Sequence, residues 1–211
     1  MQASVPGLPS GRRGTTLIEI MVVLSVMLVA VSIFYQMVLS TKRLRTVNHE
    51  NAVAFGAARS IVERMRNEDF ADVYRIYNAD PSDDPGAPGS APGNRFPVEG
   101  LPPLSSAADG MVGEVMFPSV AVKTKPAGGS PGVVGFGALQ AQAIPEWQLR
   151  EDFADAELGM PRDLNGDSII DDLDHGDDYL ILPVRVRLEW EGVFGSRSVE
   201  LYTMLGEFKK P

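Results

Sequence analysis

The fold of this chain is decided at Arg12-Arg13-Gly14-Thr15-Thr16-Leu17-Ile18-Glu19-Ile20 and by the apolar segment that follows. The twenty residues from Ile20 to Leu39 contain no Asp, Glu, Lys or Arg. A helix rises about 1.5 Å per residue, so twenty residues span the roughly 30 Å hydrocarbon core of a bilayer. Glu19 lies at the start of this segment, and ionisable groups inside membrane helices usually have a functional reason. The sequence therefore predicts a membrane helix that carries a functional carboxylate.

Three interpretations compete for this N-terminal segment, and two of them concern membrane targeting alone. A cleaved secretory signal has an apolar region of about 7–15 residues, followed by a small-residue cleavage site. Here the apolar segment is longer and ends in Tyr35-Gln36-Met37-Val38-Leu39, with no Ala-x-Ala pattern after it. A plain membrane anchor fits the length but gives no reason for Glu19.

The third interpretation is a family resemblance. Arg-Gly, then Thr-Thr-Leu-Ile-Glu, then an uninterrupted apolar helix resembles the N-terminus of type IV pilin-like proteins: pilins, minor pilins and the pseudopilins of type II secretion. The resemblance is close from residue 11 to about residue 40. It implies that prepilin peptidase cleaves after Gly14, that the new N-terminus at Thr15 is methylated, and that Glu19 supports assembly with other pilin or pseudopilin subunits. The first mature residue of the family is most often Phe, whereas here it is Thr15.

The charge of Glu19 agrees with what the resemblance implies. A carboxylate moved alone into hydrocarbon costs several kcal/mol, so it needs a partner. Cleavage after Gly14 would create an α-amino cation on Thr15, one helical turn and about 6 Å from Glu19 along the axis. Between neighbouring helices, such a pair would fix the axial register.

Composition narrows the classes of protein. The 211 residues include no cysteine and two histidines, which excludes disulfides, zinc–thiolate sites and thiol catalysis. The formal charge of −9 would become −11 if Arg12 and Arg13 left with a leader, and no basic patch indicates nucleic-acid binding. No nucleophile elbow or phosphate-binding loop is present, so we expect a protein that is not an enzyme.

The domain organisation follows from changes along the chain. Residues 1–14 are predicted to be a prepilin leader, 15–40 the membrane and assembly half of a long helix, and 41–78 its amphipathic half, ending between Asn67 and Asn78. Pro, Gly, Ser and Asp dominate the connecting loop at 79–110. Residues 111–211 are predicted to form an antiparallel-sheet head.

The end of the chain carries the strongest sheet signal. Val184, Val186, Leu188 and Trp190 alternate with charged residues, and Gly192-Val193-Phe194-Gly195 follows as a turn. A second alternating segment begins at Val199, so we predict an antiparallel hairpin. Another strand, interrupted by Pro118, is predicted within 111–124. Because the apolar face of the hairpin needs a cover, the fold class is α+β, with the amphipathic half of the helix packed on a small sheet.

A second candidate site lies in the acidic segment 151–178, which holds eleven acids and one base. Residues 163–174 resemble the twelve-residue calcium loop of EF-hand and dockerin-type proteins. The predicted Ca²⁺ ligands are Asp163, Asn165, Asp167, the carbonyl of Ile169, Asp171 and Asp174. The usual glycine of loop position 6 is Ser168, and Gly176 argues against a helix leaving the loop. A solvated acidic loop is the alternative; His175 suggests a transition metal, but one imidazole among many carboxylates favours calcium.

These features together predict a structural subunit, a minor pilin or pseudopilin of a type IV pilus or a type II secretion pseudopilus. We expect it to begin in the inner-membrane lipid with its C-terminal head in the periplasm, although Lys42, Arg43 and Arg45 follow the apolar segment and favour the opposite orientation. The alternative is a permanently anchored periplasmic calcium-binding module that does not polymerise.

Overall fold

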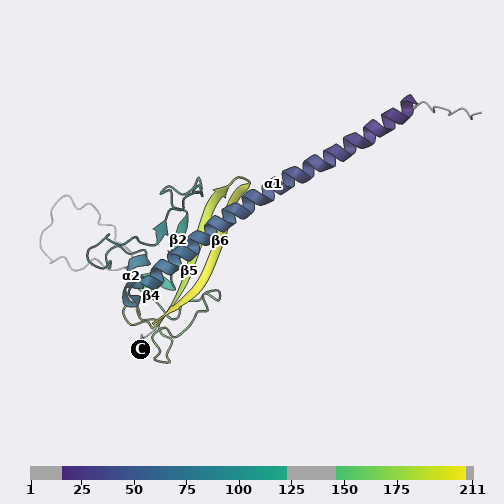
Figure 1. Ribbon diagram of the computed structural model, residues 1–211. Helices are drawn as coiled ribbons and strands as arrows, with labels where there is room; N and C mark the ends of the chain where they lie inside the picture. The colour runs from purple at the N-terminus through teal and green to yellow at the C-terminus, as the bar shows by residue number, and fades with distance from the viewer. Residues whose placement is uncertain (1–15, 123–145, 208–211) are drawn as a thin grey trace, which may run out of the picture. The chain divides into compact units, whose positions relative to one another are not determined.

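The structure is a computed structural model that describes residues 16–122 and 146–207 (Figure 1). Its elements, in chain order, are the helix α1 (Leu17–Asn67), the 3-10 helix η1 (Phe70–Asp72), the helix α2 (Val73–Tyr77) and six strands. The strands are β1 (Arg95–Phe96), β2 (Gly113–Met116), β3 (Ser119–Val122), β4 (Glu146–Leu149), β5 (Ile181–Gly192) and β6 (Gly195–Gly206). The chain forms two compact units, which divide inside α1 between Thr46 and Val47.

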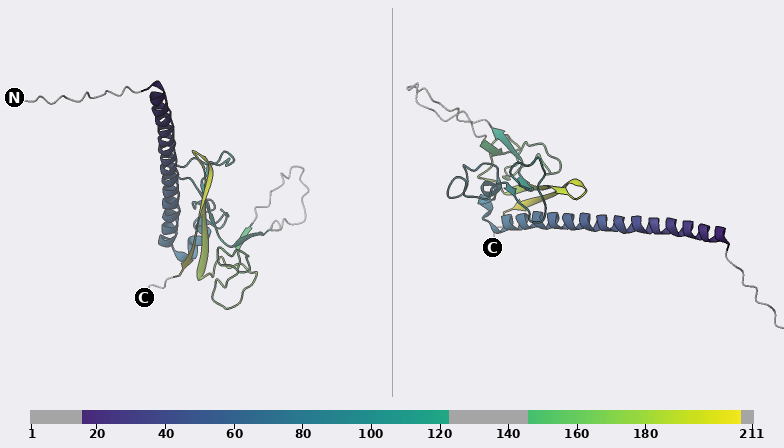
Figure 2. Two further views of the ribbon diagram at one scale, coloured as in Figure 1. Left: turned by 90° about the vertical axis from the view of Figure 1, so that its right-hand side faces the viewer. Right: turned by 90° about the horizontal axis from the view of Figure 1, so that it is seen from above.

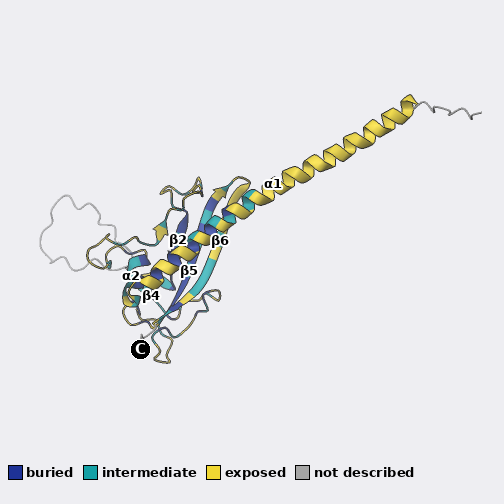
Figure 3. Ribbon diagram, viewed as in Figure 1, coloured by how far each residue is buried: buried dark blue, intermediate teal, exposed yellow. Residues whose placement is uncertain are grey.

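In the first unit, α1 is apolar and open to its surroundings. Every residue from Thr16 to Arg45 is exposed (Figure 3). Ser25 satisfies its own hydroxyl by donating to the carbonyl of Met21 at 2.8 Å, and Thr41 does the same to Met37 at 2.9 Å. Such back-bonding lets hydroxyl side chains lie in an apolar helix without unpaired polar groups. By length and composition, α1 is long and apolar enough to cross a membrane.

The second unit is built on a four-stranded antiparallel sheet of order β1-β2-β5-β6. Strands β5 and β6 form the predicted hairpin, with Gly192 paired to Gly195 at the turn. The apolar residues of β5 are buried on one face, whereas Arg185, Arg187 and Glu189 alternate with them. A separate pair, β3 and β4, forms a two-stranded antiparallel sheet.

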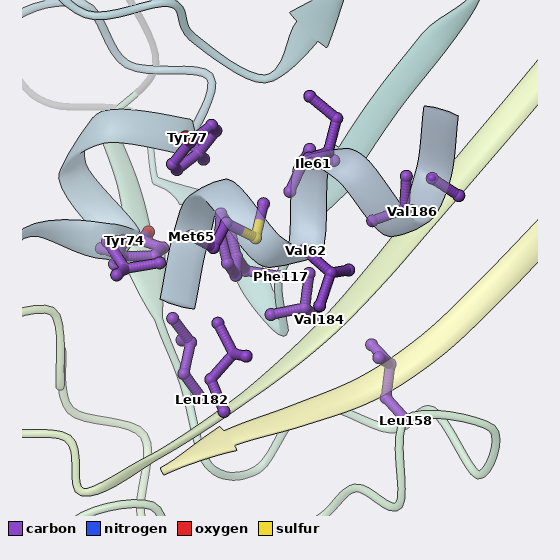
Figure 4. Close-up of a cluster of buried hydrophobic side chains, with 14 of the residues drawn as sticks. Ile61, Val62, Met65, Tyr74, Tyr77, Phe117, Leu158, Leu182, Val184 and Val186 are labelled. Atoms are coloured by element: carbon purple, nitrogen blue, oxygen red, sulfur yellow. The ribbon is translucent and has the colours of Figure 1, made fainter. Parts of the chain in front are cut away.

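The core of the head lies between this sheet and the part of α1 that begins at Val47 (Figure 2). The buried residues that α1 contributes have roughly helical spacing; they are Ala54, Ala58, Ile61, Val62 and Met65. In the close-up view, Ile61, Val62 and Met65 lie over Leu182, Val184 and Val186 of β5 (Figure 4). The prediction of an α+β fold, with a long helix packed on a small antiparallel sheet, is confirmed.

The connections refine the predicted boundaries. α1 ends at Asn67, inside the predicted interval, and η1 and α2 follow it. Pro118 divides the strand predicted within 111–124 into β2 and β3, which belong to different sheets. The loop predicted at 79–110 contains the two-residue strand β1, which pairs with β2. Strand β4 was not predicted, because a strand of four residues carries too little periodicity to stand out.

Candidate functional site

Glu19, the predicted assembly residue, lies in the first turn of α1 and is exposed. Its amide donates to the carbonyl of Thr16 at 3.0 Å and faces the Thr16 hydroxyl at 3.4 Å. Thr16-Leu17-Ile18-Glu19 thus has the spacing of a helix capping box, which the sequence reasoning had not noted. A carboxylate in the first turn is also favoured by the helix dipole. Gly14 and Thr15, the predicted processing residues, lie outside the described residues.

The acidic segment that follows β4 is closed at its base by Leu149. The Leu149 amide donates to Oδ1 of Asp174 at 2.9 Å, and the Leu149 carbonyl accepts from the amide of His175 at 2.9 Å. Leu164 is buried inside the segment, and its carbonyl accepts from the amides of Leu180 and Ile181. The segment therefore leaves the end of β4 and returns to it before entering β5.

The loop 163–174 folds around its own first residue. Asp163 accepts hydrogen bonds from the amides of Gly166 and Ser168, the latter at 2.7 Å. Ser168, at loop position 6, has a φ of 70°, the left-handed conformation for which glycine is normally chosen. Asn165 and Asp167 accept from the amides two residues further on. Ser168 thus adopts the left-handed backbone that glycine usually takes at this loop position.

Asp171 and Asp174, the last two side chains predicted to bind Ca²⁺, interact with groups outside the predicted ligand set. Oδ1 of Asp174 accepts from the amides of Leu149 and Gly176 and is thereby held toward β4. Oδ1 of Asp171 accepts from the amide of Leu173 at 2.9 Å and lies 3.1 Å from Nε2 of His175. The carbonyl of Ile169 was also predicted as a ligand, and the side chain of that residue is exposed. The calcium assignment stays a prediction.

A second group of potential ligands includes Asp171 of the loop and two buried side chains outside it. Among the described residues, Glu151, Asp171 and His175 form the one group of three or more His, Cys, Asp or Glu side chains whose ligand atoms all lie within 4.8 Å of one another. Glu151 is fully buried and His175 is 4% exposed. Oε1 of Glu151 accepts from the amide of Leu164 at 2.6 Å and lies 3.9 Å from Nε2 of His175.

The electrostatics of this group are set by its carboxylates. Burial acts to lower the pKa of His175, but hydrogen bonds to Asp171 and Asp178, together with the charge of Glu151, outweigh burial and raise it. The pKa of Asp171 is lowered, first by the hydrogen bond from the Leu173 amide and then by the ring of His175. Both ring nitrogens of His175 have carboxylate partners, since Nδ1 lies 3.0 Å from Oδ1 of Asp178.

The sequence indicated His175 but not Glu151, because Glu151 is one of eleven acids in the segment and precedes His175 by 24 residues. The local signal around Glu151 is a glutamate just after a short strand, which is common on protein surfaces. Only the return of the chain to Leu149 brings the two side chains together.

Comparisons of the chain with protein-family models, with curated proteins and with solved structures found no match. The architecture that these residues define is that of a protein with a long apolar N-terminal helix, a candidate membrane span, whose amphipathic continuation carries an α+β head.

Proposed function

We propose that this chain is a structural subunit, a minor pilin or pseudopilin, of a type IV pilus or a type II secretion pseudopilus. The observation that carries the proposal is the composition of α1. The first part of this helix is exposed and apolar, with Glu19 in its first turn and no charged residue from Ile20 to Leu39. The second part is amphipathic, and its buried face covers an antiparallel sheet. A membrane anchor needs only the first of these features. A subunit that packs through its helix and presents a folded head uses both.

The proposed maturation would supply a cationic partner for Glu19. Prepilin peptidase would remove residues 1–14 at the inner membrane, and the α-amino group of Thr15 would become the nearest cation. In the lipid phase, this subunit would be held by α1 alone, with its head in the periplasm. In the polymer, the Glu19 carboxylate of one helix would meet the terminal amine of a neighbouring subunit, which fixes their axial register.

The test combines a mass measurement with a charge substitution. The mass of the chain recovered from cells should correspond to residues 15–211, with one added methyl group. Glu19→Gln should be processed normally but should not enter the polymer, whereas Glu63→Gln, an exposed glutamate on the same helix, should assemble like the wild type. A chain that retains residues 1–14, or normal incorporation of Glu19→Gln, would instead favour a permanent anchor.

We propose in addition that the loop 163–174 binds a structural Ca²⁺, because its left-handed turn at Ser168 and its alternating oxygen side chains suit a hard cation. Ca²⁺ added to the metal-free chain should raise its melting temperature. Asp167→Asn should remove most of that rise, since the amide keeps the hydrogen bond from Ile169 but loses the charge. Glu99→Gln, an exposed acid outside the loop, is the control. Identical melting curves with and without Ca²⁺ would end this proposal.

A further inference from the structure

The carboxylate of Glu151 is left incompletely satisfied in the interior of the head. Its Oε1 accepts two amide hydrogen bonds, from Leu164 at 2.6 Å and from Asn165 at 3.3 Å. Its Oε2 is buried and has no hydrogen-bond partner in the described part of the chain. A fully buried carboxylate with an unpaired oxygen is costly, because neither water nor a donor replaces its hydration. What is missing in the described part of the chain is therefore a hydrogen-bond donor or a cation at Oε2 of Glu151.

Protonation of His175 does not meet this need. An imidazolium has two N–H donors, and here Nδ1 lies 3.0 Å from Asp178 while Nε2 lies 3.1 Å from Asp171. Both donors are thus committed, and the 3.9 Å from Nε2 to Oε1 of Glu151 is too long for a hydrogen bond. Protonation of Glu151 would create a buried donor in place of a buried acceptor. A proton on either residue leaves one polar atom of Glu151 unpaired.

A cation bound by the carboxylate of Glu151 would compensate its buried charge and could also bind Asp171 and His175. Metal–nitrogen and metal–oxygen bonds of about 2.0–2.2 Å place the ligand atoms of a tetrahedral site about 3.4 Å apart. The distances from Nε2 of His175 to Asp171 and to Glu151, 3.1 and 3.9 Å, lie on either side of that value. A proton on Nδ1, donated to Asp178, leaves the lone pair of Nε2 directed at the site. Metal-binding histidines commonly have this carboxylate partner, which fixes their tautomer.

The donor set selects the class of metal. Ca²⁺ and Mg²⁺ take oxygen ligands and rarely bind an imidazole, whereas Zn²⁺ and its neighbours accept a mixture of nitrogen and carboxylate oxygen. We propose that Glu151, Asp171 and His175 bind one divalent cation of the zinc class, with Asp178 as a positioning residue that orients the ring of His175. This site shares Asp171 with the predicted calcium loop and differs from it by the nitrogen ligand of His175. Assembly through α1 does not require it.

The cation would join the start of the acidic segment, at Glu151, to the part near its end that contains Asp171 and His175. Glu151 follows β4, Asp171 belongs to the acidic loop, and His175 lies where the segment returns to Leu149. Three protein ligands leave a fourth position for water or for a group from outside. The metal would therefore stabilise the base of the acidic segment and hold the loop against β4.

The experiment is a titration of the full chain in detergent micelles with Zn²⁺, and with Co²⁺ as a spectroscopic probe. The titrations are run without Ca²⁺, because Asp171 is also a predicted ligand of the loop 163–174. We expect one Zn²⁺ per chain and visible Co²⁺ absorption bands that Zn²⁺ abolishes. Glu151→Gln and His175→Gln should each weaken binding by more than about 100-fold, and Asp178→Asn by about 10- to 100-fold. His49→Gln, at the other histidine, should bind like the wild type.

The variants separate metal binding from folding. In Glu151→Gln the side-chain oxygen can still accept from the amides of Leu164 and Asn165, so near-ultraviolet circular dichroism should match the wild type. Equal Zn²⁺ affinity for the wild type, Glu151→Gln and His175→Gln would overturn the proposal. A wild-type chain that binds no Zn²⁺ would also overturn it. So would a Co²⁺ spectrum that His49→Gln loses and His175→Gln keeps.

Discussion

Glu50 connects α1 to the turn of the β5–β6 hairpin, and its removal tests the packing of the head. Its side chain is buried, with Oε1 3.3 Å from the amide of Val193 and Oε2 3.4 Å from Nε of Arg197. The indole nitrogen of Trp190 lies 3.5 Å from the same Oε2. A Cβ added at Gly192 would lie 2.8 Å from that oxygen, so any larger residue there would displace the Glu50 carboxylate. One carboxylate thus holds three parts of the hairpin.

The size of the effect follows from these contacts. A hydrogen bond to a charged group contributes about 1.5–3 kcal/mol, and removing one partner of a buried ion pair costs about 3–5 kcal/mol. The Glu50 contacts are long, at 3.3–3.5 Å, and the side chain of Arg197 is 23% exposed, so solvent reduces both values. We expect Glu50→Ala to lower the free energy of unfolding by about 2–3 kcal/mol, and Glu50→Gln by about 1 kcal/mol.

Urea unfolding of the full chain in micelles, followed by tryptophan fluorescence, measures this difference. Trp190 is fully buried beside Glu50, so its emission reports the loss of the packing in question. Glu63→Ala is the matched control, because the ion pair of Glu63 with Arg66 is exposed and should contribute less than about 0.5 kcal/mol. Equal unfolding midpoints for Glu50→Ala and Glu63→Ala would show that the buried contacts of Glu50 stabilise the head no more than an exposed ion pair does.

Three further substitutions test other parts of the structure in the same assay. Met65→Ala should lower the free energy of unfolding by about 2–5 kcal/mol, because Met65 is 1% exposed in the core; Met37→Ala, in the exposed apolar part, should leave it nearly unchanged. Ser168→Gly should raise the free energy of unfolding by about 1 kcal/mol, because glycine adopts the left-handed backbone without strain; Ser168→Ala should give no such gain. Glu19→Gln should stay within about 0.5 kcal/mol of the wild type, because the side chain is exposed and lies outside the unit that forms the head; a larger loss would contradict that placement.

The parts of the fold that could be predicted from the sequence are those with long, regular patterns. The 51-residue helix α1 follows from an uninterrupted apolar segment and a proline-free continuation. The hairpin follows from the alternation that runs from Val184 to Trp190 and resumes at Val199, within two twelve-residue strands. Strands β1 and β4 have two and four residues, and their pairing depends on partners elsewhere in the chain. Tertiary contacts, and not local preference, decide such short elements.

The two candidate metal sites also differ in whether local sequence or tertiary contacts bring their residues together. The spacing of oxygen side chains in 163–174 is local, so the sequence is enough to predict a cation-binding loop there. The group of Glu151, Asp171 and His175 forms only because Leu149 pairs with His175 and Glu151 accepts from Leu164. No residue spacing encodes that closure. The sequence indicated the histidine but not which of the surrounding acids would be buried with it.

The structure also divides the acids of the segment 151–178 by how their charge is compensated. Three arginines from outside the segment (Arg75, Arg150 and Arg185) pair with one set: Asp152, Asp155, Asp172 and Asp177. A second set surrounds His175, and a third, in the loop, accepts hydrogen bonds from backbone amides. The last two sets are where a cation lowers the electrostatic energy most, since amides and a single imidazole neutralise less charge than an arginine does. The loop offers oxygen ligands alone, whereas the buried group adds a nitrogen, so the two sets should differ in the metal that they select.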